Sequence, residues 1–336
     1  MRIIIDAMGG DNAPAAVCEA VANCSSKTDA ELVLVGREED IRAELSKYGS
    51  FENVSIVNAD EVITNHEEPV KAVKTKKNSS LVVAAKMLKD DEGDAFVSCG
   101  STGAILTAAL LIVGRIKGIK RPALATLLPS EKGPVMLIDS GANTGCKPEN
   151  LVQFALMGNI YMRDYMDIKN PKIALMSNGE EEGKGDALVK ETYPILKNSD
   201  LNFIGNIEGR DVMLGRADVI VCDGFTGNVI LKTVEGMAAV VANALKKIFL
   251  KNILTKVGAL LTKKGVSEFK KTMDYREYGG APFLGVKKPV IKGHGSSDSK
   301  AVMAAINQAI LFAKKNYQQT LINELTTIEE GENEDE

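Results

Sequence analysis

Six short segments of the sequence combine glycine with small side chains that can donate hydrogen bonds. Glycine lets the backbone approach a ligand closely, and free N–H groups at a helix start, together with Ser, Thr and Asn side chains, suit an anion. One such segment alone is ordinary turn or N-cap chemistry, but six together favour a phosphate-bearing or polyanionic ligand. They are Asp6-Ala7-Met8-Gly9-Gly10-Asp11-Asn12-Ala13-Pro14, Gly100-Ser101-Thr102-Gly103, Asp139-Ser140-Gly141-Ala142-Asn143, Ser177 to Gly185, Asp223-Gly224-Phe225-Thr226-Gly227-Asn228 and Gly293-His294-Gly295-Ser296-Ser297.

Within these segments we expect a set of small or acidic residues to contact substrate or phosphate. Asp223 has an alternative role as the cap of the helix that follows it, where Thr226 lies in the first turn. The residues of this predicted binding set are Asp6, Gly9, Gly10, Asn12, Ser101, Thr102, Gly103, Asn178, Gly179, Asp223, Gly224, Thr226, Gly227, Ser296 and Ser297.

Lys184 is the one lysine inside a glycine-rich segment. It lies between Gly183 and Gly185 and follows three consecutive glutamates. A flexible backbone there can turn the ammonium toward bound phosphate as a point charge, which we favour over a solvated surface lysine.

The two histidines, His66 and His294, differ in their surroundings. His66 lies in a polar stretch typical of a surface. His294 is flanked by glycines and followed by Ser296 and Ser297, so a hydrogen bond to a ligand or an acid–base role is balanced against a structural one. Neither histidine has a second His or Cys at metal-ligand spacing, so no zinc site is expected.

The five cysteines are odd in number and widely spaced, which argues against a disulfide framework and indicates reduced thiols. Cys99 and Cys222 end predicted strands and could accept an acyl group, but a buried apolar role is favoured because no histidine lies nearby in the sequence. No phosphate-binding P-loop, G-x-G-x-x-G after a strand, H-E-x-x-H or G-x-S-x-G is present. We expect no metal and no cofactor.

The charge and the ends of the chain restrict the partners and the location. With 41 basic and 45 acidic residues the net charge is −4, which gives no general reason to bind nucleic acid. The N-terminus reaches Asp6 without the apolar run of a signal peptide, so a cytoplasmic location is expected. The stretch 95–114 lacks charge, but its small polar residues indicate a buried strand, a turn and a buried helix rather than a membrane span.

Short apolar runs that alternate with segments of helical spacing predict an α/β fold, with several of the six segments at strand ends. No repeat or linker reveals a domain boundary, so residues 1–328 are expected to form a single unit with an unknown internal boundary, followed by an acidic disordered tail at 329–336. The predicted strands are Arg2–Met8, Glu31–Gly36, Val54–Ala59, Ala95–Cys99, Ala123–Leu128, Val135–Asp139, Lys172–Ser177, Asn202–Ile207 and Asp218–Cys222.

The segment from Lys246 to Lys264 is basic and has apolar residues at helical spacing. No acid occurs between Gly236 and Ser267, so contact with an anionic membrane or an acidic partner protein is balanced against a dimer-interface or core-covering helix. The residues expected to make this contact are Lys246, Lys247, Leu250, Lys251, Ile253, Leu254, Val257, Leu260 and Leu261.

Taken together, these segments resemble those of the PlsX-type phosphate acyltransferases of bacterial phospholipid synthesis. The resemblance begins at Asp6-Ala7-Met8-Gly9-Gly10-Asp11, includes Tyr278-Gly279-Gly280-Ala281-Pro282, and ends at Gly293–Ser297, so it covers nearly the whole chain. It implies a three-layer α/β/α fold with a large mixed sheet, similar to isocitrate and isopropylmalate dehydrogenases and to phosphotransacetylase, in two intertwined halves and a homodimer.

The resemblance also implies a reaction, in which inorganic phosphate attacks the thioester of a long-chain acyl group on acyl carrier protein and releases acyl phosphate. It favours peripheral attachment to the inner face of the cell membrane, where a membrane glycerol-3-phosphate acyltransferase would take the product. A thiolate leaves readily and phosphate is already an anion, so the site needs a phosphate cradle and oxyanion donors rather than a triad. We assign Lys184 to phosphate, Asn228 and Asn143 to the oxyanion or to phosphate, and His294 to the thioester.

Three rival functions remain at this point. A phosphotransacetylase acting on acyl-CoA and a nicotinamide-dependent dehydrogenase share the implied fold, and fold alone does not exclude them. A membrane-docked scaffold would bind acyl carrier protein without turnover.

Overall fold

The computed structural model describes residues 1–272 and 279–334, and the chain groups into two compact units. Unit 1 comprises residues 1–126, 156–170 and 279–336, and unit 2 comprises residues 127–155 and 171–278. Each unit is thus assembled from segments far apart in the sequence, and no change of composition marks the points at which the chain passes between them.

Unit 1 is built on a mixed sheet with the strand order β3-β2-β1-β4-β11-β10-β5. The first five strands in this order are parallel, whereas β10 is antiparallel to both β11 and β5. Ile3 in β1 lies opposite Leu32 in β2 and Ala95 in β4. The strands are β1 Arg2–Asp6, β2 Glu31–Gly36, β3 Val54–Asn58, β4 Ala95–Ser98, β5 Ala123–Leu128, β10 Ala281–Leu284 and β11 Val290–Lys292.

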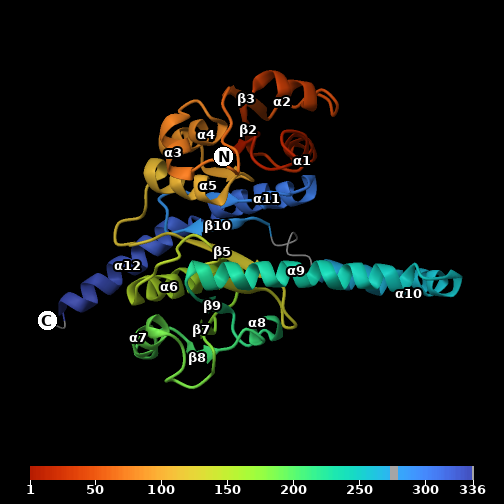
Figure 1. Ribbon diagram of the computed structural model, residues 1–336. Helices are drawn as coiled ribbons and strands as arrows, with labels where there is room; N and C mark the ends of the chain where they lie inside the picture. Colours follow the sequence, from red (N-terminus) through yellow and green to blue (C-terminus); the bar gives the residue numbers. More distant parts are fainter. Residues whose placement is uncertain (273–278, 335–336) are drawn as a thin grey trace. The chain divides into compact units, whose positions relative to one another are not determined.

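Both faces of this sheet are covered, because consecutive residues of β1, β2 and β4 are buried and consecutive side chains point to opposite faces. Helices α3, α4 and α5 lie on one side of the sheet, and α1, α2 and α11 lie on the other (Figure 1). The helices of unit 1 are α1 Ala15–Ser25, α2 Glu38–Leu45, α3 Pro69–Thr75, α4 Ser80–Lys89, α5 Thr102–Ala108 with the π-helix Ala109–Val113, α11 Ser299–Lys315 and α12 Tyr317–Glu334. Helix α6 Pro148–Tyr165 begins in unit 2 and continues into unit 1 from residue 156.

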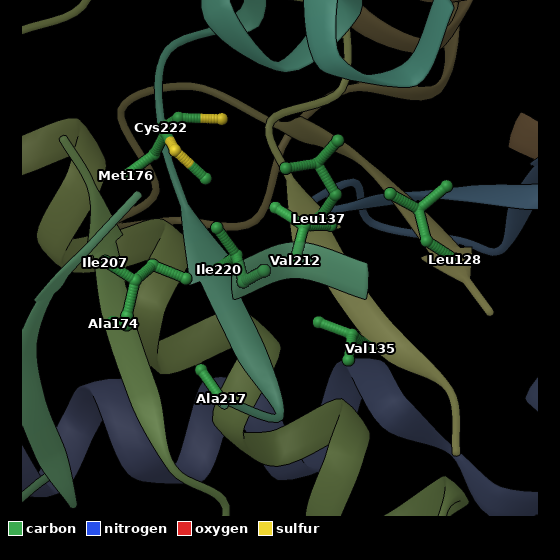
Figure 2. Packing of buried hydrophobic residues seen from close by; sticks show 10 residues of the cluster. All are labelled: Leu128, Val135, Leu137, Ala174, Met176, Ile207, Val212, Ala217, Ile220 and Cys222. Atoms are coloured by element: carbon green, nitrogen blue, oxygen red, sulfur yellow. The ribbon is translucent and has the colours of Figure 1, made fainter. Parts of the chain in front are cut away.

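Unit 2 contains four parallel strands in the order β6-β9-β7-β8. They are β6 Val135–Ile138, β7 Ile173–Met176, β8 Phe203–Ile207 and β9 Val219–Val221, and the helices are α7 Ala187–Lys197, α8 Asp211–Leu214, α9 Gly224–Phe249 and α10 Ile253–Thr272. Leu137 of β6, Ala174 of β7, Ile220 of β9 and their neighbours form an apolar core (Figure 2). This core fixes the strand ends from which the loops of unit 2 emerge.

The basic segment forms parts of two helices rather than one. Helix α9 ends at Phe249, and Asn252 starts α10 through a reciprocal cap, in which Asn252 Oδ1 accepts from Thr255 N at 2.9 Å and Asn252 N donates to Thr255 Oγ1 at 3.0 Å. Asn and Thr side chains favour a turn of this kind over a continuous helix, and the spacing of apolar residues alone does not predict it. The basic segment from Lys246 to Lys264, predicted to have helical spacing, thus comprises the end of α9 and most of α10, joined at residues 250–252.

Helix α9 is long and apolar enough by length and composition to cross a membrane, yet only 6% of its most apolar window is buried in the structure. In α10 the exposed fractions reach 80% for Ile253, 82% for Leu254 and 81% for Leu261. The two helices contact each other but leave most of their apolar side chains uncovered within the described residues.

The α/β fold class with a mixed sheet and helices on both faces is confirmed, and each of the nine predicted strands forms. The stretch 95–114 folds as β4, α5 and the π-helix, as predicted. Helix α12 extends to Glu334, into the run that the sequence assigned to a disordered tail, and residues 335–336 lie outside the described residues, as does Tyr278.

Candidate active site

Three of the predicted segments meet in unit 1 at the carboxyl ends of β1, β4 and β11. Asp11 N donates to the carbonyl oxygen of Gly295 at 2.8 Å, and Gly293 N donates to that of Ser98 at 2.9 Å. Asn12 Nδ2 donates to the carbonyl oxygen of Ser297 at 3.1 Å. Gly10 has a φ of +101°, and a Cβ there would lie 3.0 Å from a backbone oxygen, so glycine is required for this close packing. Residues 6–12, 98–103 and 293–297 thus form one hydrogen-bonded cluster. The first two of these segments follow predicted strands and were expected at one sheet edge, whereas the strand before 293–297 was not predicted.

The carboxylate of Asp6 holds this cluster together from inside. The residue is 2% exposed, its Oδ2 accepts from Ser98 Oγ at 2.7 Å, and its Oδ1 accepts from Met8 N at 3.1 Å. Burial raises the pKa of Asp6, although the hydrogen bonds from Ser80, Ser98 and the backbone act in the opposite direction. The side chain that the sequence placed in the binding set therefore faces the interior.

His294 is half-buried at the surface of the same cluster. Its Nδ1 lies 2.9 Å from Ser296 Oγ, and Ser297 N donates to the carbonyl oxygen of His294 at 3.0 Å. The ring is therefore held against Ser296, whose backbone N also donates to His294 Nδ1 at 3.2 Å. His66, the other histidine, is exposed, as predicted.

In unit 2 the order β6-β9-β7 places the segments 139–143, 223–228 and 177–185 side by side at one edge of the sheet. Asp139 organises the first of them and is fully buried. Its Oδ1 accepts from Gly141 N at 3.1 Å and Ala142 N at 3.0 Å, and its Oδ2 accepts from Asn143 N at 2.7 Å and Asn143 Nδ2 at 2.8 Å. One amide N–H of the predicted oxyanion donor Asn143 is thus used within the loop.

The second segment is joined to the first by the start of α9. Gly224 N donates to the carbonyl oxygen of Asn143 at 2.7 Å, and Asp223 caps the helix by accepting from Thr226 N at 2.8 Å. A Cβ at Gly227 would lie 1.9 Å from the backbone oxygen of Asp139, so only glycine allows this approach. The exposed side chain of Asn228 lies next to Gly141, which brings one predicted site residue to the loop that holds another.

Lys184 lies in the third segment, a loop closed by the hydrogen bond from Gly185 N to Asn178 Oδ1 at 2.9 Å. The buried Asn206 of β8 donates through Nδ2 to the carbonyl oxygen of Glu181 at 2.9 Å and anchors the loop to the sheet. The stem of Lys184 crosses Gly179, where a Cβ would lie 2.8 Å from Lys184 Cγ. Among the described residues, the exposed ammonium of Lys184 makes no hydrogen bond or ion pair.

The two candidate cysteine nucleophiles are buried thiols. Cys99 is 3% exposed, and burial raises its pKa to about 11. Cys222 is 4% exposed, and burial together with the nearby Asp139 raises its pKa well above the ordinary value. Both are neutral thiols at neutral pH, which agrees with the apolar role that the sequence favoured.

The structure therefore divides the predicted site residues between two clusters. Unit 2 holds Asn143, Asn178, Gly179, Lys184, Asp223, Gly224, Thr226, Gly227 and Asn228, and unit 1 holds Asp6, Gly9, Gly10, Asn12, Ser101, Thr102, Gly103, His294, Ser296 and Ser297. Sequence reasoning gave no separate role to Asp139 and missed Asn206. The strand-ending position of Asp139 was a usable signal, whereas nothing in the sequence marks Asn206.

The fold is shared with known acyl-transfer enzymes. A phosphotransacetylase from Streptococcus pyogenes superposes with a TM-score of 0.60 at 20% identity, covering 92% of this chain and 94% of that one. The EutD phosphotransacetylase from Staphylococcus aureus gives a TM-score of 0.57 at 14% identity, covering 93% and 94%. These likenesses define the class of fold.

The sequence comparisons define the family. The family model described as "Fatty acid synthesis protein" matches residues 1–320, and the chain belongs to this family. A protein named phosphate acyltransferase from Thermoanaerobacterium thermosaccharolyticum is 53% identical over 92% of each chain. Its namesake from Brevibacillus brevis is 48% identical over 99% of this chain and 100% of its own length.

Proposed function

We propose that this protein transfers a long-chain fatty acyl group from the thioester of acyl carrier protein to inorganic phosphate, forming acyl phosphate for phospholipid synthesis. The name shared by the relatives supports phosphate as the acceptor. The observation that carries the proposal is the edge of unit 2 at which the loops 139–143, 177–185 and 223–228 meet, with the ammonium of Lys184 unpaired among the described residues. Such an edge offers an anion a positive charge and short polar side chains.

The chemistry requires few protein groups. A phosphate oxygen attacks the thioester carbonyl carbon, the C–O bond forms, and the C–S bond of the tetrahedral intermediate breaks to release a thiolate that takes up a proton. We assign phosphate binding to Lys184, and stabilisation of the oxyanion or positioning of phosphate to Asn228 and Asn143. Loss of one such donor raises a barrier by about 3 kcal/mol. His294 is assigned separately, to orient the thioester or to protonate the leaving thiolate.

The test uses palmitoyl-acyl carrier protein with and without inorganic phosphate. Phosphate-dependent release of both free carrier thiol and hydroxylamine-trappable acyl phosphate is expected. Acetyl-CoA in place of the carrier substrate tests a phosphotransacetylase, and NADH formation from hydroxy acids tests a dehydrogenase. Carrier binding without phosphate-dependent release would refute the proposal and leave a scaffold.

Replacing Lys184 by Ala is expected to lower acyl phosphate formation at least tenfold, a loss on the order of 1.4 kcal/mol in transition-state stabilisation. Lys190→Ala is the matched control, because Lys190 is an exposed lysine of α7 outside the loop. Wild-type turnover in Lys184→Ala, with the fold intact, would remove this residue from the site.

We also propose that the cytoplasmic protein attaches peripherally to the inner face of the cell membrane through α9 and α10. Six lysines from 246 to 264 accompany the exposed apolar residues, and no acid occurs between Gly236 and Ser267. This combination suits an interface with anionic lipid.

Leu254→Glu with Leu260→Glu is expected to abolish binding to vesicles containing anionic lipid. The control pair Ile195→Glu and Leu214→Glu adds the same charge at exposed apolar positions of α7 and α8. Unchanged vesicle binding would assign the surface to a homodimer or to the carrier protein, which size-exclusion chromatography and carrier binding then separate.

A further inference from the structure

The loop that carries Lys184 holds more negative than positive charge. Glu180, Glu181 and Glu182 precede the lysine, and a Cβ at Gly179 would lie 2.9 Å from Glu181 Oε2 as well as 2.8 Å from Lys184 Cγ. Glu181 alone thus already sets one carboxylate beside the lysine stem. A second free carboxylate would make the surroundings of Lys184 net negative and repel an anion.

The other two glutamates are held by cations outside the loop. Arg216, which follows α8, approaches Glu180 with both guanidinium nitrogens, at 2.5 Å from Nη1 to Oε1 and 3.4 Å from Nη2 to Oε2. Lys197, in the last turn of α7, binds Glu182 at 2.8 Å from Nζ to Oε2. Two of the three carboxylates are therefore paired with cations other than Lys184.

Arg216 is itself held in place by a buried acid. Its Nη1 lies 3.3 Å from Oδ1 of Asp211, which is 2% exposed, and Asp211 Oδ2 accepts from Glu208 N at 2.9 Å. Arg210 binds Glu208 at 2.7 Å but lies 3.8 Å from Glu180. Glu180, Glu208 and Asp211 could together hold a cation, but Arg216 and Arg210 supply positive charge to this group.

We propose that Arg216 is a positioning residue that keeps Lys184 available to phosphate by holding Glu180 away from it. The inference rests on the proposed role of Lys184 in phosphate binding. The physical basis is that Glu180 and phosphate compete for the ammonium of Lys184. Glu180 is the neighbour of Gly179, over which the stem of Lys184 passes. If Arg216 releases the Glu180 carboxylate, that carboxylate pairs with the Lys184 ammonium or repels the incoming anion. Lys197 does the same for Glu182, with both partners more exposed.

The test compares single and double variants of Arg216 and Glu180 and measures how each binds inorganic phosphate. Arg216→Gln, which keeps a hydrogen-bond donor for Asp211, is expected to raise the phosphate KM and the calorimetric Kd for inorganic phosphate by up to roughly fivefold, the limit for an exposed ion pair. The kcat is expected to stay unchanged. Adding Glu180→Gln removes the released charge and restores both constants, and Glu180→Gln alone leaves them at the wild-type value.

Arg210→Gln is the matched control. It removes the same charge from the same group of acids but leaves Glu180 bound to Arg216, so the phosphate constants should not change. The effect of Arg216→Gln should also shrink in high salt, because both partners are 44% exposed.

Two results would overturn the inference. If Arg216→Gln leaves phosphate binding unchanged, or if Glu180→Gln fails to rescue it, Arg216 does not act through Glu180. In the Lys184→Ala background Arg216→Gln should have no further effect, and an added loss would equally exclude the route through Lys184. The calorimetric titration needs no acyl donor, so it decides the inference even if the proposed carrier-protein substrate is wrong, which only the turnover assay tests.

Discussion

Replacing Asp139 by Asn tests whether one buried carboxylate holds the loop of unit 2 in shape. Each carboxylate oxygen accepts two N–H groups: Gly141 and Ala142 at Oδ1, and two from Asn143 at Oδ2. An asparagine in the same rotamer can offer its single oxygen to one pair only, and its NH₂ then faces the donors of the other pair. The substitution therefore loses two hydrogen bonds to a charged acceptor whichever way the amide turns.

The magnitude follows from these two bonds. A hydrogen bond to a charged group contributes about 1.5–3 kcal/mol, so two are worth about 3–6 kcal/mol before the loop relaxes. Because Gly141 and Ala142 are partly exposed and can turn to water, we expect a loss of about 3 kcal/mol in the free energy of unfolding. The kcat should fall as well, because Asn143 accepts the backbone hydrogen bond that places Gly224 at the start of α9.

The assay is urea unfolding followed by circular dichroism, with a lower midpoint and an unchanged slope as the expected result. Asp218→Asn is the control, since Asp218 makes a side-chain hydrogen bond to Lys172 N at the other end of the sheet, where a loss of about 1 kcal/mol is expected. A loss for Asp139→Asn no greater than that of the control would refute the reasoning that this carboxylate organises the loop.

Three further predictions concern packing, thiol reactivity and pH. Gly227→Ala should destabilise the protein by at least about 2 kcal/mol in thermal melts, because its Cβ would lie 1.9 Å from a backbone oxygen. Cys222, buried with a raised pKa, should resist Ellman's reagent in the native protein at pH 8, while the partly exposed Cys146 reacts. The pKa of Asp6 in the folded protein lies above its ordinary value of 3.8, so the native state binds the proton more tightly than the unfolded state does. The contribution of Asp6 to stability therefore falls as the pH rises from 3.8 through the pKa of the folded state. Asp6→Asn should remove this slope from the pH dependence of the urea midpoint.

A specific result would contradict each of these three predictions. Gly236→Ala, in the same helix as Gly227 but with nothing within 4 Å of its Cβ, should stabilise the protein by up to about 1 kcal/mol, and equal melting temperatures for the two variants would contradict the packing argument. Rapid labelling of Cys222 would show that burial does not protect it. A wild-type midpoint that rises relative to that of Asp6→Asn across the same pH window would give the pKa shift of Asp6 the opposite sign.

The sequence was sufficient for the nine strands from β1 to β9, and it missed β10 and β11. Runs such as 31–36 and 123–128 form strands with the predicted bounds. Strands β10 and β11 have four and three residues, β10 contains Pro282, and β11 pairs with β4, far away in the sequence. Such strands show no hydrophobic period, and only long-range pairing defines them. The antiparallel part of the mixed sheet could therefore not be predicted from local sequence patterns.

The candidate site, like the fold, was predictable where local patterns define it and not where long-range contacts do. Glycine-rich segments after parallel strands must lie at one sheet edge, and the structure confirms this within each unit. The partners that tune them were not predictable, because the ion pair between Glu180 and Arg216 spans 36 positions and no local motif signals it. Asn206 reaches the Lys184 loop from another strand in the same way.

The acids at the strand ends show why residue type alone misassigns roles in such a site. Asp6 and Asp139 each follow or end the first strand of a cluster, are buried, and use their oxygens for N–H or O–H groups of the adjoining loops. A carboxylate would repel a phosphate at the surface, but inside the loop it directs the backbone and leaves the small side chains outward. In the site that we propose, the anion is received by groups that carry no negative charge, namely backbone N–H groups, asparagine amides and Lys184. The two units thus share a local arrangement, in which a buried carboxyl group accepts hydrogen bonds from the adjoining segments and fixes their shape.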